Sequence, residues 1–137
     1  MNSYRDKIRE GNEELFEKGN LDLIPELFSD QYIAHAGGKE HQGHDFIRKW
    51  TKQLRKAIPD VHIQKIEILN ESENIVSWQR TLKGTHKEKL MGILPSHREV
   101  TWREIVVSRF DEEKISEEWV VSELAGYLLS HPPLKRN

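Results

Sequence analysis

One carboxylate near the C-terminal end of the chain, that of Glu123, has the sequence surroundings of an acid or base catalyst. The β-branched and aromatic residues from 115 to 125 predict a strand. Because alternate side chains of a strand share a face, Ile115, Glu117, Trp119 and Val121 are expected on the same side as Glu123. Burial raises the pKa of a carboxyl group because it disfavours the charged form. We therefore predict that Glu123 exchanges protons with a ligand near neutral pH. The structural alternative is that Glu123 forms an ion pair or lies at the rim, at the end of the strand.

Two earlier predicted strands, 75–83 and 100–110, place large apolar and ionisable side chains on one face each. The alternate residues are Val76, Trp78, Arg80 and Leu82 in one strand, and Val100, Trp102, Glu104 and Val106 in the other. Such a mixture is typical of a ligand pocket as well as of a core. We predict that the pocket is lined by Trp50, Trp78, Arg80, Trp102, Glu104 and Trp119.

Each of these residues also has a purely structural explanation. A tryptophan taken alone is explained by core filling. Arg80 could anchor a carbonyl or carboxylate group of a substrate, or it could pair with Glu104 or Glu123 across the sheet. The buried pair is the commoner reason for an inward-facing arginine.

Three histidines in the first half of the chain, His35, His41 and His44, raise the question of a metal site. Glu123 or His86 could complete the ligand set, because zinc and non-haem iron bind histidine and carboxylate groups. The segment that carries the three histidines contains glycines and no helical pair four residues apart. We therefore predict that the protein has no metal site.

The elements that must position these residues come in the order helices first, strands second. Ser3 and Asp6 resemble a capping box at the start of a helix over 4–18. A shorter helix is predicted over 22–28, a brief extended piece over 32–36, a polar loop over 37–43, and an amphipathic helix from Phe46 until Pro59.

From residue 61 the pattern changes to strands, over 61–69, 75–83, 100–110 and 115–125, with polar turns between them. The connections are too short for crossover helices, so we predict an α+β domain in which an antiparallel meander packs against the helices. Long antiparallel strands curl, and helices on the concave side of a curled sheet leave a cavity. We expect a single domain over 1–137, mainly helical to residue 60, with sheet over 61–126 and a loose tail over 127–137.

The composition restricts the classes of partner and compartment. The 137 residues include 21 basic and 23 acidic side chains, mixed along the chain, which argues against nucleic acid or a membrane surface as the partner. There is no cysteine, which permits a reducing compartment. The N-terminal stretch lacks the apolar run of a signal peptide, and no segment resembles a membrane span. We expect a soluble, cytoplasmic protein.

Several short motifs, none specific alone, resemble in their order and spacing the SnoaL-like polyketide cyclases, over about residues 27–126. They are 57–60 (AIPD), 84–86 (GTH), 91–93 (MGI), Pro95, 109–110 (RF), 114–115 (KI), Glu117, Trp119 and Glu123. The resemblance implies a nuclear transport factor 2-like fold, which is a cone of curved antiparallel sheet closed by N-terminal helices. It also implies a homodimer through the sheet.

The founding members of that family close a polyketide ring by aldol condensation, with an acidic residue as the acid/base and no metal or cofactor. The resemblance therefore implies that Glu123 removes a proton from carbon, while His86 or His35 hydrogen-bonds the enolate oxygen. The chain departs from the family pattern at Glu123, where aspartate is usual, and at Glu88, where glycine is expected.

Three functions stay open at this point. The first is cofactor-independent proton transfer on a small hydrophobic carbonyl compound, such as aldol-type cyclisation or isomerisation. The second is a pocket that only binds such a molecule, in which case its polar groups should be paired among themselves. The third is a structural or dimerisation module without a cavity.

Overall fold

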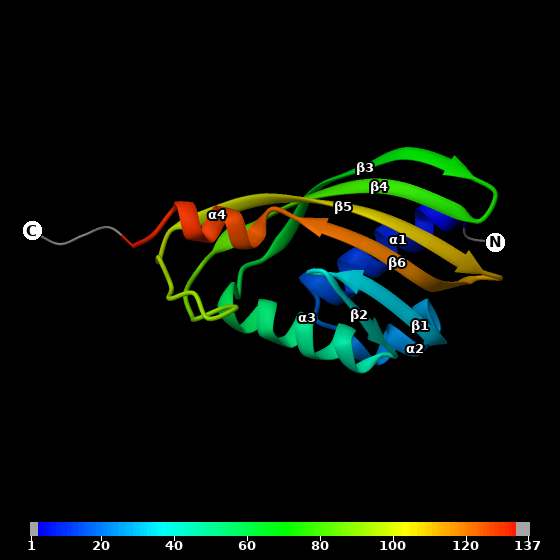
Figure 1. The fold of residues 1–137 in the computed structure, drawn as a ribbon, viewed down its shortest axis with the longest axis horizontal. Coiled ribbons are helices and arrows are strands. Elements are labelled where there is room, and N and C mark those ends of the chain that lie inside the picture. The colour runs from blue at the N-terminus through cyan, green and yellow to red at the C-terminus, as the bar shows by residue number, and fades with distance from the viewer. Residues whose placement is uncertain (1–2, 134–137) are drawn as a thin grey trace, which may run out of the picture.

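The computed structural model describes residues 3–133 and confirms the α+β class. A curved six-stranded sheet is covered on its concave side by helices (Figure 1). The first helix, α1 (Tyr4–Asn12), begins at a capping box in which Ser3 Oγ accepts from the Asp6 amide at 3.1 Å. It continues as a π-helical turn, η1 (Glu13–Glu17), so the helix predicted over 4–18 is confirmed.

The segment after the first helix holds more strand than predicted. A 3₁₀ turn, η2 (Leu21–Leu23), leads into the short helix α2 (Ile24–Leu27), where Pro25 lies in the first turn. Strand β1 (Phe28–Ala36) then begins four residues before the predicted extended piece. The predicted polar loop contains strand β2 (Lys39–Gln42), because Gly37 and Gly38 adopt positive φ angles of 62° and 75° and form a tight hairpin turn.

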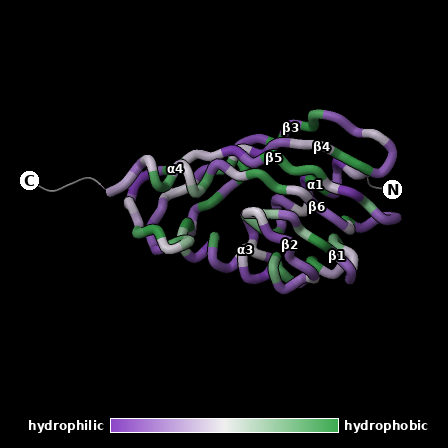
Figure 2. The backbone as a smooth tube through the Cα atoms, viewed as in Figure 1, coloured by the Kyte–Doolittle hydropathy of each residue, from purple (hydrophilic) through white to green (hydrophobic). Residues whose placement is uncertain are grey.

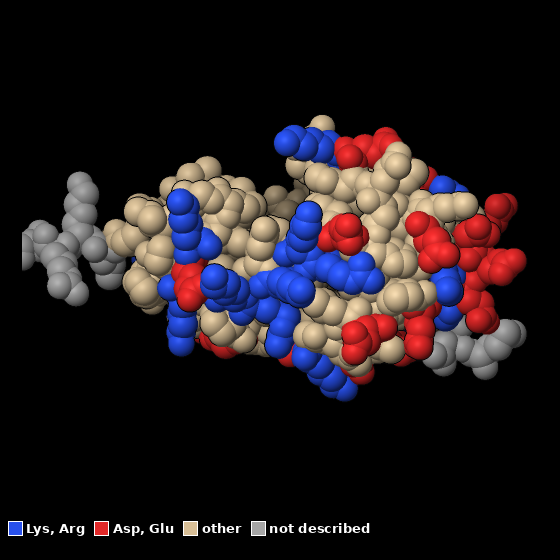
Figure 3. Space-filling model, turned by 90° about the horizontal axis from the view of Figure 1, so that it is seen from below, with Lys and Arg blue, Asp and Glu red and all other residues tan. Residues whose placement is uncertain are grey.

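The predicted amphipathic helix is α3 (Asp45–Ala57), and it buries the stripe Ile47, Thr51, Leu54 and Ala57 beneath the sheet. Its opposite face carries the basic residues of the helix. Figure 3, which views the molecule from below, shows lysine and arginine side chains gathered over the middle of this surface. Arg55 holds the helix to η1, because its guanidinium donates to the carbonyl oxygens of Phe16 and Glu17 at 2.6 and 2.9 Å.

The other four strands form the predicted antiparallel meander: β3 (His62–Ser72), β4 (Ile75–Thr85), β5 (Glu99–Asp111) and β6 (Lys114–Ser122). The turns after β3 and β5 are hydrophilic, as Figure 2 shows. The strand order is β2-β1-β6-β5-β4-β3, so the sheet is not wholly antiparallel. β1 pairs with β6 in parallel, and this contact joins the helical half of the chain to its last strand.

The predicted end of the last strand, at residue 125, is wrong. β6 ends at Ser122, and Glu123 is the residue before helix α4 (Leu124–Ser130). Leu124 and Leu128 are buried on one side of this helix, so the predicted loose tail begins too early. The last four residues of that tail lie outside the described part of the chain.

One end of the cone is closed by contacts between residues 57–60 and residues 84–88. The Asp60 carboxylate accepts hydrogen bonds from the Thr85 amide and hydroxyl at 2.7 and 2.8 Å. The Ala57 carbonyl accepts from the amides of Lys87 and Glu88. Gly84 permits this approach, because a Cβ atom at that position would lie 2.3 Å from Ile58 Cγ2. Within residues 3–133, no helix is both long and apolar enough to cross a membrane.

Candidate functional site

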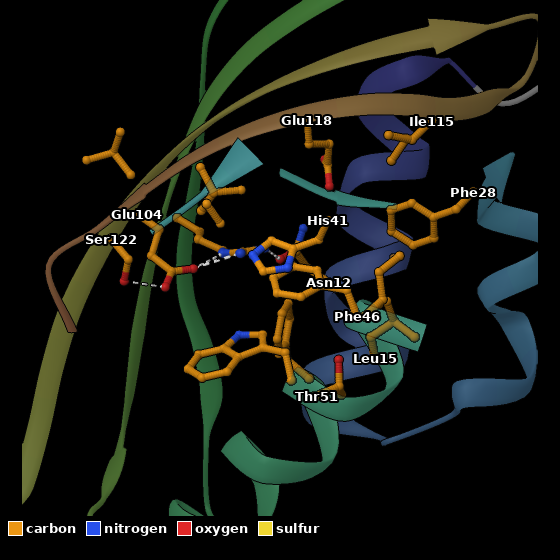
Figure 4. Close-up of a pocket in the computed structure, with 18 of the residues that line it drawn as sticks. Asn12, Leu15, Phe28, His41, Phe46, Thr51, Glu104, Ile115, Glu118 and Ser122 are labelled. Carbon is orange, nitrogen blue, oxygen red and sulfur yellow. Dashed lines mark hydrogen bonds and ion pairs between the residues drawn. The ribbon is translucent and has the colours of Figure 1, made fainter. Parts of the chain in front are cut away.

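A cavity of about 670 Å³ lies between the helices and the concave face of the sheet. Its walls come from α1, η1, β1, α3 and the inward residues of β4, β5 and β6, and they are mainly apolar. Figure 4 shows polar side chains among these walls. The ionisable or hydrogen-bonding residues at the lining are Lys7, Asn12, Tyr32, Lys39, His41, Thr51, Arg80, Glu104, Glu118 and Ser122, together with Trp50 and Trp78, which have indole N–H groups.

Glu118 is the cavity carboxylate held only by neutral hydroxyl donors among the described residues. Tyr32 Oη donates to its Oε1 at 2.8 Å, and Ser108 Oγ donates to its Oε2 at 2.5 Å. The indole N–H of Trp78 donates in turn to Ser108 Oγ at 2.9 Å. Burial raises the pKa of Glu118, while the bonds from Ser108 and Tyr32 and the charge of Arg80 act in the opposite direction. A carboxyl group of this kind is suited to proton transfer nearer neutral pH than a free glutamate.

Tyr32 shares this environment. The pKa of its hydroxyl is raised well above the ordinary value, first because the side chain is buried and then because the negative charge of Glu118 lies beside it. Tyr32 therefore stays a hydrogen-bond donor to Glu118 throughout the pH range in which a protein works.

A second polar cluster centres on Arg80. Its guanidinium donates to Glu104 Oε1 at 2.7 Å and to Asn12 Oδ1 at 2.9 Å. The other carboxylate oxygen, Glu104 Oε2, accepts from Ser122 Oγ at 2.6 Å and from the Trp102 indole at 3.2 Å. The buried pair that the sequence favoured for Arg80 is thus present, with Glu104 as the partner. Its charges are opposite and adjacent, so the cluster as a whole adds no net charge to the cavity.

A β-bulge in β6 decides which carboxylate enters the cavity. Opposite β5, Glu117 pairs with Arg109 and Ile115 pairs with Phe110, so Ser116 is an extra residue on β6. An extra residue reverses the alternation of faces beyond it. Ile115 and Glu118 therefore both face inward, and Glu117 and Trp119 face outward.

The predicted pocket residues are only partly brought together. Trp50, Trp78, Arg80 and Glu104 line the cavity, and Trp102 lies behind Glu104 as its hydrogen-bond donor. Trp119 does not line it, because the bulge turns this side chain to the outer face of the sheet, where it is 39% exposed.

Glu123 is not on the dry face of a strand. Its side chain is 51% exposed and forms a two-pronged ion pair with Arg103, whose Nε and Nη2 donate to the two carboxylate oxygens at 2.9 Å each. These bonds from Arg103 lower the pKa of Glu123, so the predicted rise is wrong. The predicted alternative pair of Glu123 with Arg80 is also not formed.

The two predicted catalytic histidines lie away from the cavity lining and are not brought together. His86 is completely buried just after the end of β4, where its backbone bonds to Arg98 and His97. Burial lowers the pKa of its imidazole. His35 lies on the outer face, where its ring stacks on Trp119 with 5.1 Å between centroids and its Nε2 contacts Glu117 Oε2 at 2.7 Å.

The histidines considered as metal ligands have separate partners. His41 stacks on Phe46 at the cavity, and His44 Nε2 contacts the Ser29 carbonyl oxygen at 2.8 Å. Among residues 3–133, no three His, Asp or Glu side chains are grouped as a metal would require.

Sequence reasoning missed Glu118, Tyr32, Ser108, Asn12 and Thr51. A signal for Ser108 was present, because it continues the even-numbered face of β5 that holds Glu104. No comparable signal identified Glu118, since strict alternation from Ile115 assigns it to the outer face.

Known proteins are similar to this protein along most of its chain. The family model for SnoaL-like polyketide cyclase matches residues 6–129. IdmH from Streptomyces antibioticus has 22% identity and a TM-score of 0.76, with 93% of this chain and 96% of that chain covered. AclR from Streptomyces galilaeus has 23% identity and a TM-score of 0.71, with 95% and 100% covered.

A third solved structure, a SnoaL-like polyketide cyclase from Agrobacterium tumefaciens, has 21% identity and a TM-score of 0.74 over 89% of this chain and 92% of that chain. At these identities the solved structures show the fold alone. A search of curated proteins found no match. The family model covers well over half of the chain, and on that ground the protein belongs to the SnoaL-like polyketide cyclase family.

Proposed function

We propose that the protein is an enzyme that transfers protons on a small hydrophobic carbonyl compound without a cofactor, in an aldol-type cyclisation or an isomerisation. The observation that carries this proposal is the position of Glu118, a buried carboxyl group with a raised pKa at the wall of an apolar cavity. Glu118 has the acid/base role that the sequence analysis predicted for Glu123.

In the proposed reaction, the Glu118 carboxylate removes a proton from the carbon beside a substrate carbonyl group, and the electron pair of that C–H bond forms an enolate. In a cyclisation the enolate carbon then attacks a second carbonyl carbon of the same molecule, which forms the C–C bond and leaves an alkoxide. Glu118 returns its proton to the alkoxide oxygen, or to a different carbon in an isomerisation. The hydroxyl groups of Tyr32 and Ser108 hold the carboxylate in place through both transfers.

The walls of the cavity have a separate role in the proposed reaction. Leu15, Phe28, Phe46 and Ile115 form apolar surface around the position of the ligand. Such a surface holds a flexible molecule in a folded conformation and keeps water from the enolate.

The test compares wild type, Glu118→Gln and Glu123→Gln on a panel of β-dicarbonyl compounds. Exchange of the acidic C–H for deuterium, followed by NMR, reports proton removal even when no ring closes. Wild type and Glu123→Gln should exchange at the same rate, whereas Glu118→Gln should be slower by about a hundredfold or more. Equal rates for all three proteins would remove Glu118 as the base.

A second function, ligand binding without turnover, is favoured by one observation. Arg80, Glu104 and Asn12 bond to one another, as expected for a pocket that only holds its ligand. In that case a β-dicarbonyl compound would bind to wild type and to Glu118→Gln with no exchange by either. The third possibility, a structural module, predicts no cavity and does not account for the 670 Å³ present.

We also propose that the protein is a homodimer through the outer face of the sheet. Ile105 and Trp119 are 45% and 39% exposed on this face. The nearby pairs Arg109–Glu117 and Arg103–Glu123 present both signs of charge, so this surface can be complementary to its own copy. Ile105→Glu should give a monomer in light scattering, while Leu129→Glu, a change on α4, should not.

We propose in addition that the protein is located in the cytoplasm, which is consistent with its lack of cysteine. Cell fractionation tests this location.

A further inference from the structure

Thr51 presents a polar atom that the fold does not use. It lies on α3 at the cavity, its residue surface is 1% exposed, and its Oγ1 has no hydrogen-bond partner among the described residues. Figure 4 shows the hydroxyl rising from α3 toward the side chains across the cavity. A buried hydroxyl without a partner costs free energy, so such groups are uncommon in folded proteins.

Packing does not explain a threonine at this position. Its neighbours along the buried stripe of α3 are Ile47 and Leu54, which are both apolar. A hydroxyl within a helix can bond to the carbonyl oxygen four residues back, and the Thr51 hydroxyl makes no such bond. A valine of the same shape would fill the space without the unpaired oxygen.

Thr51 is the fully buried residue of the lining with such an unpaired group among the described residues, because Trp50 and His41, whose ring nitrogens also make no hydrogen bond there, are only half-buried. The buried charged groups of the cavity are already bonded. Arg80 is taken by Glu104 and Asn12, and the ammonium group of Lys7 contacts Glu113. Lys39, the remaining cation of the lining, is exposed to solvent. The interior therefore offers no unpaired buried cation among the described residues to hold a ligand carboxylate, while a neutral oxygen could accept a bond from Thr51.

We propose that Thr51 is the specificity-determining residue of the cavity, where its hydroxyl donates a hydrogen bond to a carbonyl oxygen of a neutral, largely apolar ligand. The proposal rests on the proposed use of the cavity for a carbonyl compound, and it does not require turnover. Because Thr51 is on α3 and Glu118 is on β6, the ligand would be held between opposite walls (Figure 4).

A distinct consequence follows for stability. A hydroxyl that bonds only to a ligand contributes nothing to the free fold, so Thr51→Val should unfold at the same denaturant concentration as wild type or at a higher one. A hydroxyl with a structural bond would have the opposite effect, because its removal would leave a partner unpaired.

The binding experiment uses fluorenone and fluorene, two flat tricyclic molecules that differ by one carbonyl oxygen. Trp50 and Trp78 line the cavity, so quenching of tryptophan fluorescence reports binding of either probe. Wild type should bind fluorenone about tenfold more tightly than fluorene, the ratio expected for one hydrogen bond. Thr51→Val should lose this preference and keep its affinity for fluorene, and Thr51→Ser should retain it.

The matched control is Thr81→Val, since Thr81 is on β4 and does not line the cavity; it should leave the preference unchanged. The proposal is overturned if wild type binds the two probes equally or binds neither, if Thr51→Val keeps the preference, or if Thr51→Val is less stable than wild type. Failure of the proposed enzymatic function has a different signature, because fluorenone has no exchangeable C–H beside its carbonyl group. Glu118→Gln could then match wild type in exchange while Thr51 still controls the preference for the ketone.

Discussion

Tyr32 and Glu118 meet across the parallel pair of strands that joins the two halves of the chain, with 2.8 Å between the tyrosine oxygen and Glu118 Oε1. The contact links residues 86 positions apart and places a hydroxyl donor on the carboxyl group proposed as the base. Burial raises the pKa of Glu118, and the bond from Tyr32 opposes that rise. The pair thus sets the pH at which Glu118 can accept a proton.

Tyr32→Phe should move this pH upward. The bond stabilises the ionised carboxylate, so its loss should raise the pKa of Glu118 further and shift the rising limb of the exchange rate to higher pH. The pH profile of deuterium exchange measures the shift. Tyr127→Phe, which removes the hydroxyl from a ring that stacks on His131 outside the cavity, is the control and should leave the profile in place.

Glu118→Gln should change the pH dependence of stability. The pKa of Glu118 is raised in the fold, so its favourable contribution is complete below the unfolded value and is lost as the pH rises through the folded value. Glutamine does not ionise, so the variant should gain stability relative to wild type as the pH rises. Urea unfolding at several pH values checks this, and a constant difference between the proteins would contradict the assigned direction of the pKa.

Removal of Arg80 alone should destabilise the protein strongly. Its side chain is 11% exposed and that of Glu104 is 5% exposed, so Arg80→Met leaves a buried carboxylate without its partner, at a cost of about 3–5 kcal/mol. Combining it with Glu104→Gln should recover part of the loss. A double-mutant cycle from denaturant unfolding measures this coupling, and simple additivity of the two changes would argue that the pair does not act as a unit.

Gly84→Ala should disrupt the closed end of the cone. The new Cβ would lie 2.3 Å from Ile58 Cγ2 and 3.1 Å from Val61 Cα, so α3 must shift relative to β4, at a cost of about 1–3 kcal/mol or more. Gly126→Ala is the matched control, because nothing lies within 4 Å of a Cβ there and alanine is favoured in a helix. Thermal unfolding should separate the two variants clearly.

His86 should make the fold sensitive to mild acid. Burial lowers the pKa of its imidazole from the ordinary value of 6.5, so the unfolded chain binds a proton more readily than the folded chain. Its contribution is complete above 6.5 and is lost as the pH falls from there through the folded value. His86→Phe should flatten the fall in stability over this range. His62→Phe, on an exposed position, should keep the wild-type slope.

Local patterns in the sequence were enough to predict the α+β class, the capping box at Ser3, the amphipathic helix α3 and the inward faces of β4 and β5. These features depend on the helical period and on the alternation of a strand, which neighbouring residues encode. The same alternation predicted that Arg80 pairs across the sheet with Glu104 or Glu123, and the structure has Glu104 as the partner.

The position of the proposed base depended on tertiary structure. The extra residue Ser116 is defined only by pairing with β5, and it exchanges the faces assigned to Glu117 and Glu118. The end of β6 before Glu123, and the parallel contact that brings Tyr32 to Glu118, likewise depend on residues far apart in the sequence. The sequence by itself therefore determined which residue types line each strand, while long-range strand pairing decided which carboxylate is buried, because register is a property of two strands and not of one.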